Sequence, residues 1–287
     1  MKTIHTIAAL REQVGAWKAE GLKLALAPTM GNLHAGHLDL ARAAREAADR
    51  VLVSIFVNPT QFGQGEDFEA YPRTLETDGA KLRSAGVDLL FVPSVDEMYP
   101  QGRGQGRERL TVVEVPELSR CLCGRSRPGH FAGVAGVVSK LFNLCSPDVA
   151  VFGEKDFQQL VVIRQMVRDL NFPVEIRAAP IRREQDGLAM SSRNRYLSPE
   201  ERRRAPRLYE TLRDLAERIR ARDCRYADLE RMGEDGLKEA GFKPDYVSVR
   251  RVSDLSEPVE GERTEDELVI LAAAYLGKAR LIDNIRV

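Results

Sequence analysis

The sequence predicts an α/β fold, in which an open, mostly parallel sheet packed with helices is followed by a smaller α+β domain. Short apolar segments alternate with helix-like segments over roughly the first 180 residues, which is the pattern of consecutive βαβ units. From Ser198 onward the chain is densely charged and helical, and it ends in strand-like segments. We therefore expect two domains, residues 1–179 and residues 180–287.

The first domain is expected to form a buried parallel sheet. The apolar run 51–60 is too short to cross a membrane and does not alternate with polar residues, so it suits a strand that is covered on both faces. The strand-like segments are the N-terminus and residues 22–29, 51–60, 87–94, 148–154 and 174–181. The helix-like segments follow the N-terminal strand, run from near Ala35 through Arg45, and cover 74–86, 136–144 and 157–170.

The second domain is expected to begin with two helices, residues 198–223 and 226–241. Ser198, Pro199 and Glu200 form a helix-start signal before the first of them. Three strand-like segments follow, residues 245–252, 267–276 and 279–287.

Charge and hydropathy exclude several classes of partner. Lys and Arg total 43 and Asp and Glu total 43, so the chain has no bulk charge that would attract nucleic acid or an anionic membrane. The N-terminus lacks the apolar core of a secretory signal, and the apolar run 268–277 is too short to span a bilayer. We expect a cytoplasmic protein without a nucleic-acid or membrane partner.

The cysteines do not predict a metal site. Cys121 and Cys123 form a C-x-C pair rather than the C-x-x-C of zinc ribbons and redox motifs, and Cys145 and Cys224 are isolated. Reduced thiols without a metal are therefore expected.

The segment "PTMGNLHAGH", residues 28–37, joins a predicted strand to a predicted helix. If the helix begins near Ala35, its first backbone N–H groups and its positive dipole end form an anion site. Glycines at 31 and 36 would let a phosphate approach the backbone. His34 and His37 lie three residues apart, so both rings could reach one phosphate. The alternative is an ordinary helix cap with packed histidines.

Other polar stretches also follow predicted strands, and ligands in such sheets bind at the carboxyl ends of the strands. "NPTQFG" offers uncharged amides, "GEKDFQQ" adds a lysine, and "AMSSRNRYL" adds hydroxyls and an arginine fork suited to phosphate. Each could instead be a strand-ending turn, a helix cap or an exposed loop. The side chains concerned are Asn58, Gln61, Lys155, Asp156, Gln159, Ser191, Ser192 and Arg193.

Together these stretches form a site rich in anion donors and poor in nucleophiles. The chain contains no G-x-S-x-G elbow and no P-loop. His34, His37, Lys155 and Arg193 would instead stabilise the charge of a triphosphate during transfer, which is electrostatic catalysis. The residues alone predict an enzyme that uses a nucleotide.

The motifs resemble those of a known family. "HAGH" resembles the HIGH pattern of the nucleotidyltransferase superfamily. The longer set "PTMGNLHAGH", "FVNPTQFG", "YPRTLETD", "RPGHFAGV", "VFGEKDFQQ" and "DGLAMSSRNRYL" is similar, in order and spacing, to the pantoate–β-alanine ligase (pantothenate synthetase) family over nearly the whole chain. The resemblance implies a Rossmann-like first domain, a C-terminal lid domain and a homodimer.

The resemblance also implies a reaction and a set of binding residues. The reaction is ATP-dependent condensation of pantoate with β-alanine through pantoyl adenylate, with release of pyrophosphate and AMP, and Mg²⁺ accompanies ATP. Gln61 and Gln159 would hold pantoate, Gln61 would also lie near β-alanine, and Asn58 would line the phosphate side. The ATP-binding residues would be Met30, Gly31, Asn32, Leu33, His34, Ala35, Gly36, His37, Gly153, Glu154, Lys155, Asp156, Arg182, Met190, Ser191, Ser192 and Arg193.

Four of these residues are the expected catalytic groups: His34, His37, Lys155 and Arg193. The family assigns His37 as a proton donor, whereas both steps mainly need charge to be neutralised, which an imidazole can do without net proton transfer. Arg182 stands where relatives commonly have a valine that contacts adenine, a contact made largely through the backbone.

Two other functions fit parts of the pattern. One is an adenylyltransferase that stops at a nucleotide product, although the neutral pair Gln61 and Gln159 is poorly suited to a phosphorylated co-substrate. The other is a nucleic-acid-binding module related to tRNA synthetases, which the zero net charge disfavours.

Overall fold

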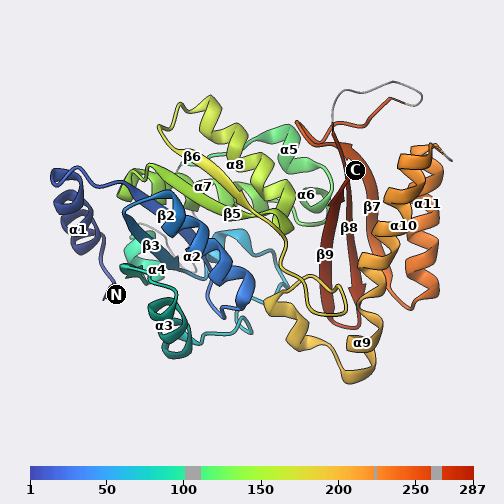
Figure 1. Cartoon of the computed structure of the whole chain (residues 1–287), viewed down its shortest axis with the longest axis horizontal. Helices are drawn as coiled ribbons and strands as arrows, with labels where there is room; N and C mark the ends of the chain where they lie inside the picture. The colour runs from blue at the N-terminus through green and yellow to red at the C-terminus, as the bar shows by residue number, and fades with distance from the viewer. Residues whose placement is uncertain (101–110, 223–224, 260–266) are drawn as a thin grey trace. The chain divides into compact units, whose positions relative to one another are not determined.

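The computed structural model describes residues 1–100, 111–222, 225–259 and 267–287 (Figure 1). The chain divides into two compact units. The first contains Met1–Glu154 and Val162–Pro180, and the second contains Lys155–Val161 and Ile181–Val287. Each unit has its own sheet, so the predicted α/β architecture with a smaller C-terminal α+β part is confirmed.

The sheet of the first unit has six parallel strands in the order β1-β4-β3-β2-β5-β6. Strands β2, β3 and β4 extend the sheet in one direction and β5 and β6 in the other, so the topology switches between β2 and β5. In open α/β sheets, ligands bind at such a switch point. The strands are β1 (Lys2–Ile4), β2 (Leu24–Thr29), β3 (Arg50–Ile55), β4 (Leu89–Phe91), β5 (Val149–Gly153) and β6 (Glu175–Ala179).

Helices connect these strands, as in βαβ units. The longer ones are α1 (Ile7–Ala19), α2 (Ala35–Ala47), α3 (Leu75–Ser84), α7 (His130–Cys145) and α8 (Phe157–Asp169). Shorter helices are α4 (Val95–Met98), α5 (Pro116–Arg120) and α6 (Cys123–Ser126), and single 3₁₀ turns are η1 (Pro59–Gln61) and η2 (Glu154–Asp156).

Both faces of the sheet are buried, which explains the continuous apolar runs of its strands. Ala25, Val51 and Val53 belong to one core cluster, together with Leu40 of α2. Their neighbours along the strands, such as Leu52, point to the opposite face and are also fully buried. A strand that is covered on both faces needs apolar residues at every position rather than at every second one.

The strands on either side of the switch point pair only at their beginnings. Between β2 and β5 the register contains only the pairs Ala25↔Val149 and Leu26↔Ala150. Strand β2 continues to Thr29 and β5 to Gly153, each paired with its other neighbour. The two strands therefore separate toward their carboxyl ends, where the predicted binding segments begin.

The second unit contains a three-stranded antiparallel sheet in the order β7-β8-β9. One face packs against two amphipathic helices, and the shared core includes Leu212, Leu229 and Ile270. Its elements are η3 (Ser192–Tyr196), α9 (Pro199–Arg204), α10 (Arg207–Ala221), α11 (Tyr226–Glu239), β7 (Lys243–Arg251), β8 (Leu268–Leu276) and β9 (Ala279–Arg286).

The single helix expected over 198–223 is wrong, because the structure contains α9 and α10 instead. Helix α9 ends at Arg204, and Pro206 is the residue before α10. Proline has no N–H and its ring clashes with the preceding turn, so it interrupts an α-helix. Asp223, the end of the expected helix, lies outside the described residues.

Within the part of the chain that the structure describes, no helix has both the length and the apolar character needed to cross a membrane.

Candidate active site

The corner between β2 and α2 has the local conformation that its sequence suggests. Strand β2 ends at Thr29 and α2 begins at Ala35, as expected, with His34 as its N-cap in an extended conformation. Gly31 has a φ of +87° and Asn32 a φ of +51°. These left-handed residues turn the chain sharply from strand to helix, and glycine and asparagine are the residues that tolerate this region best.

The two histidines of the corner lie side by side. The centroids of the His34 and His37 rings are 4.0 Å apart. The backbone N–H of His34 donates to Nδ1 of His37 over 3.2 Å. Because Nδ1 accepts this bond, a neutral His37 ring carries its proton on Nε2. His37 thus caps the helix with one nitrogen and has a donor on the other.

Asp78 of α3 holds the corner in place, and sequence reasoning missed it. Its carboxylate accepts the backbone N–H groups of Asn32 and Leu33, each over 2.8 Å, and the hydroxyl of Thr74 over 3.0 Å. The residue is fully buried. On the same helix, Nζ of Lys81 donates to the Leu33 carbonyl over 2.6 Å. The only signal in the sequence is that Asp78 lies four residues before Leu82, on the same face of a predicted helix.

The segment after β3 places two predicted residues in one buried network. The Asn58 amide donates to Oε1 of Gln61 over 3.1 Å, and its Oδ1 accepts the Tyr99 hydroxyl over 2.9 Å. Gln61 in turn donates to the sulfur of Met30 over 3.1 Å. Met30, which was predicted from a separate motif, is therefore brought together with Asn58 and Gln61 in the first unit.

Helix α7 and the residues before it support this network, through side chains to which no role was assigned. His130 Nδ1 lies 2.8 Å from the Gln61 carbonyl oxygen. The Arg127 guanidinium lies 3.0 Å from His130 Nε2 and donates twice to Glu66, over 2.7 Å each. Arg127 and His130 belong to the motif "RPGHFAGV", and Gln61 and Glu66 contact them. The sequence indicates this motif only through the family resemblance.

Arg127 determines the ionisation state of Glu66. Burial raises the pKa of Glu66, but the hydrogen bonds and charge of Arg127 outweigh burial and hold the pKa below 4.5. The carboxylate is therefore ionised at neutral pH and keeps Arg127 oriented toward His130.

Gly153 and Glu154 lie at the end of β5, the other strand of the switch point. Gly153 faces α2, because a Cβ added to it would lie 3.9 Å from Leu40. The predicted residues of the first unit thus follow β2, β3 and β5, which are neighbours in the sheet. Since parallel strands end at the same edge, these residues lie along one edge of the sheet.

Lys155 and Asp156 lie in η2 directly before α8, Gln159 lies in the first turn of α8, and all three belong to the second unit. Asp156 is exposed and directly precedes the helix, and the Lys155 side chain is mostly buried, with Nζ 4.0 Å from the Asp156 carboxylate. Gln159 is partly exposed.

Arg182 and Met190 are paired in a short hairpin of the second unit. The Met190 N–H donates to the Arg182 carbonyl over 2.9 Å, and Arg183 and Ala189 form an antiparallel bridge. Beyond the hairpin, the hydroxyl of Ser191 accepts the backbone N–H of Arg193 over 3.2 Å. The loop that carries Ser192 and Arg193 therefore begins at a fixed base.

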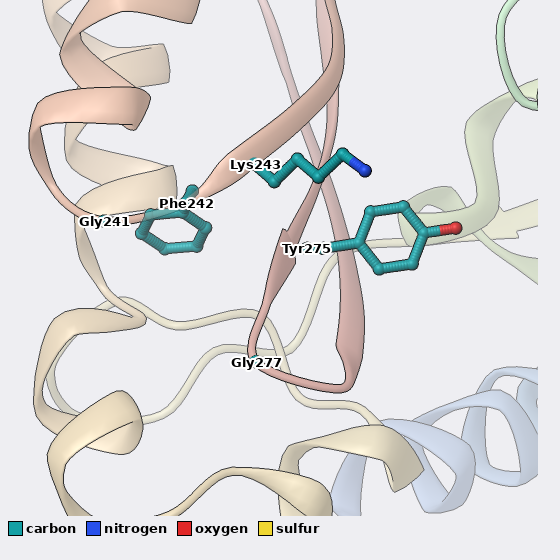
Figure 2. Close-up of a pocket in the computed structure, with 5 residues that line it drawn as sticks. All are labelled: Gly241, Phe242, Lys243, Tyr275 and Gly277. Carbon is teal, nitrogen blue, oxygen red and sulfur yellow. The ribbon is translucent and has the colours of Figure 1, made fainter.

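The second unit also contains a pocket that none of the predicted site residues lines. It has a volume of about 350 Å³ and is lined by Gly241, Phe242, Lys243, Tyr275 and Gly277. Figure 2 shows the Lys243 and Tyr275 side chains extending in the same direction from paired positions of β7 and β8.

The described cysteines are free thiols, Cys121, Cys123 and Cys145, whereas Cys224 lies outside the described residues. Burial raises the pKa of Cys145 to about 12, only weakly opposed by the charge of Lys18, so this thiol is unreactive at neutral pH. Within the described ranges, no group of three or more His, Cys, Asp or Glu side chains is arranged to hold a metal ion.

A parallel sheet with a topological switch point, and a histidine-bearing helix start beside it, define a Rossmann-like α/β enzyme. Comparison with known proteins narrows this class. The family model described as pantoate-beta-alanine ligase matches residues 2–286. The chain therefore belongs to the pantoate–β-alanine ligase family and is a ligase of that kind, which decides against the adenylyltransferase and the nucleic-acid-binding module.

Individual relatives agree with this assignment. The chain is 56% identical over 285 residues to the pantothenate synthetase of Alkalilimnicola ehrlichii, covering 99% of this chain and 97% of the relative. It is 46% identical to a pantothenate synthetase structure from Thermus thermophilus, with a TM-score of 0.87 and coverage of 99% of both chains. A pantoate–β-alanine ligase from Francisella tularensis, solved in complex with β-γ ATP and β-alanine, has a TM-score of 0.81 at 34% identity, with 99% of this chain and 97% of that chain covered.

Proposed function

We propose that this enzyme joins pantoate to β-alanine with ATP by way of pantoyl adenylate. In the first step, a carboxylate oxygen of pantoate attacks the α-phosphorus of ATP, the bond to the β-phosphate bridging oxygen breaks, and pyrophosphate leaves. In the second step, the amine of β-alanine attacks the acyl carbon, the bond to the AMP oxygen breaks, and the amine releases its proton. The products are pantothenate, AMP and pyrophosphate.

The observation that carries this proposal is the paired histidines at the start of α2, beside the switch point of a chain from this family. Both steps build negative charge on phosphate oxygens. Donors that are already oriented toward such charge lower the barrier without a cost of reorganisation. Nε2–H of His37, which the helix cap holds, would be such a donor, and the ring of His34 lies beside it.

The remaining binding roles follow the same logic. Gln61 and Gln159 would bind pantoate through neutral amides, and Gln61 would also lie near β-alanine. Lys155 and Arg193 would neutralise the phosphates, and Asn58 would line their side of the site. Three segments would bind the nucleotide, largely through backbone groups: Met30–His37, Gly153–Asp156 and Met190–Arg193. Arg182 would lie toward adenine.

Mg²⁺ enters this proposal as part of the substrate Mg·ATP. The side chains expected to neutralise the phosphates are two imidazoles, a lysine and an arginine, which are poor ligands for a hard cation. The ion would therefore be held by phosphate oxygens, whose charge it offsets.

The test is an assay for AMP with pantoate, β-alanine and Mg·ATP, in which each is omitted in turn. AMP formation is expected to need all three. Pantoate labelled with ¹⁸O in its carboxylate should transfer one labelled oxygen to AMP, because the carboxylate oxygen forms the bond to the α-phosphorus. Release of ADP and phosphate, or unlabelled AMP, would contradict the adenylate route.

The homodimer and the cytoplasmic location are further parts of the proposal, supported by the family resemblance. Light scattering after size-exclusion chromatography is expected to give about twice the mass of one chain, and a monomer mass at assay concentrations would contradict the dimer.

A further inference from the structure

Two adjacent polar residues of β9, Asp283 and Asn284, are almost completely buried. They are 3% and 4% exposed, and the predicted site includes neither of them. Burying a carboxylate is unfavourable unless it is paired and hydrogen-bonded, and a buried amide likewise needs partners. The hydrogen-bond partners of Asp283 and Asn284 show which segments of the chain these two residues hold in place.

Asp283 forms a two-point ion pair with Arg183. The guanidinium donates to the two carboxylate oxygens over 2.6 and 2.9 Å. The same guanidinium lies 3.6 Å from the centroid of the Tyr209 ring of α10. A planar guanidinium that is both paired and stacked has a single orientation.

Arg183 in turn anchors the hairpin at residues 182–190. Its guanidinium donates to the Gly187 carbonyl at the hairpin turn over 3.1 Å. At the far end of the same hairpin, the side-chain amide of Asn194 donates to the Ala189 carbonyl over 3.1 Å. The loop Met190–Arg193 leaves this hairpin directly, so its starting point depends on Asp283 through Arg183.

Asn284 holds a different segment. Its side-chain amide donates to the backbone carbonyl of Lys155 over 3.1 Å. Two residues further along the same face of the strand, the Arg286 guanidinium lies 5.4 Å from the centroid of the Phe157 ring. Successive side chains of a strand point to opposite faces, so β9 holds the Lys155 segment from one face and the hairpin from the other.

We propose that Asp283 and Asn284 are positioning residues for ATP, which set the backbone of Lys155 and the base of the Met190–Arg193 loop from one strand of the second unit. The proposal rests on the proposed function, because it takes these two segments as the phosphate-binding ones. Lysine is a point charge on a flexible stem, so its position depends on where its backbone is held. Groups that are held within a fraction of an ångström by supporting hydrogen bonds bind more tightly than free ones.

The first test is Asn284→Asp, which keeps the side-chain shape but removes the donor to the Lys155 carbonyl, with Asn284→Ala as a second variant. The KM for ATP is expected to rise roughly tenfold, while the KM values for pantoate and β-alanine change less than about twofold. Direct titration of each variant with Mg·ATP, without pantoate, should show the same loss of affinity.

The second test is Asp283→Asn, and Arg183→Lys replaces it if that protein does not fold. Both remove the two-point pair that orients the hairpin. A rise in the KM for ATP is expected here too, together with a lower kcat, because Arg193 is an expected catalytic group.

The matched control is Asp245→Asn. Asp245 and Arg280 form another mostly buried ion pair of the same sheet, with a 2.6 Å contact. In the bonds described above, neither residue contacts Lys155 or the hairpin. This variant should lose some thermal stability and keep its KM for ATP.

Two results would overturn the inference. One is an unchanged affinity for Mg·ATP in the folded Asn284 variants. The other is an equal change in Asp245→Asn, which would mean that the effect is general loosening of the sheet. If the wild-type enzyme forms no AMP, the proposed function fails, whereas the comparison of Mg·ATP affinities still tests the two positioning residues.

Discussion

His37 has a structural role in the helix cap, and we propose a chemical role for the same ring. Its Nδ1 accepts the His34 N–H and so caps α2, and in the neutral ring Nε2 then carries a proton that would be donated to a phosphate oxygen. This tautomer fits a group that stabilises charge, because donation of a hydrogen bond does not require the proton to leave.

Replacing His37 with alanine is expected to remove about 2–4 kcal/mol of transition-state stabilisation, the range for one well-aimed donor, so kcat/KM should fall by about one and a half to three orders of magnitude. The measurement is the steady-state rate of AMP formation. His5→Ala is the matched control, because His5 is an exposed histidine of the same unit that bonds only the Val92 carbonyl in the contacts described. Wild-type turnover of His37→Ala would refute the assigned role.

Asp78 is the residue on which the conformation of the corner depends. Asp78→Ala leaves the buried N–H groups of Asn32 and Leu33 without their acceptor, and each such loss costs about 1–3 kcal/mol. We expect lower stability of the first unit and weaker binding of ATP. Urea unfolding followed by the fluorescence of Trp17, the only tryptophan of the chain, measures the first effect.

The control for this substitution is Asp39→Ala, which removes an ion pair on α2 whose Arg42 is 58% exposed. Such exposed pairs contribute about 0–1 kcal/mol. If Asp78→Ala were no less stable than Asp39→Ala, the corner would not depend on Asp78.

At the scale of elements, α7 and η1 approach so closely that only glycine fits between them. A Cβ on Gly133 would lie 2.4 Å from the Thr60 carbonyl oxygen and 2.6 Å from the Gln61 Cα. The close approach lets the Asn58 amide reach the Gly133 carbonyl over 3.2 Å. The glycine thus determines where the proposed pantoate-binding Gln61 lies.

Gly133→Ala is therefore expected to destabilise the protein by about 1–3 kcal/mol, the usual cost of overpacking, and to raise the KM for pantoate. Gly236→Ala in α11 is the control, since an added Cβ there meets nothing within 4 Å and alanine favours a helix by up to about 1 kcal/mol. Thermal unfolding and steady-state kinetics of both variants measure the effects. A Gly133→Ala enzyme with normal pantoate kinetics would show that η1 tolerates displacement.

The stability of the first unit as a whole should depend on pH through Glu66. Its pKa in the folded protein lies below 4.5, so the pair with Arg127 stabilises the fold above about pH 4.5 and this contribution is lost as the pH falls through the lowered pKa. Glu66→Gln should lower stability at neutral pH and flatten the loss in acid. Urea unfolding at a series of pH values, followed by Trp17 fluorescence, measures this.

Glu175→Gln is the control for the pH series. The hydrogen bond from Arg177 also lowers the pKa of Glu175, but both side chains are exposed, so the pair contributes little. Identical pH profiles for Glu66→Gln and the wild type would contradict the assignment.

Local signals in the sequence were enough to predict the strands, most helices, the corner at residues 28–37 and the family. Periodicity, turn residues and helix caps act over a few positions, and the family motifs are likewise continuous in the chain. Pro206, which divides the helix expected over 198–223, is also a local signal, because proline interrupts an α-helix.

The residues that support the site become apparent only in the folded chain. His130 meets the Gln61 carbonyl 69 positions away, Asp283 pairs with Arg183 100 positions away, and Asn284 reaches Lys155 129 positions away. A hydrogen bond between such distant residues leaves no periodicity in the chain, and each partner alone resembles an ordinary polar residue. Local motifs are therefore enough to predict a site and to propose its chemistry, whereas the contacts that hold its residues in place are long-range and exist only once the chain has folded.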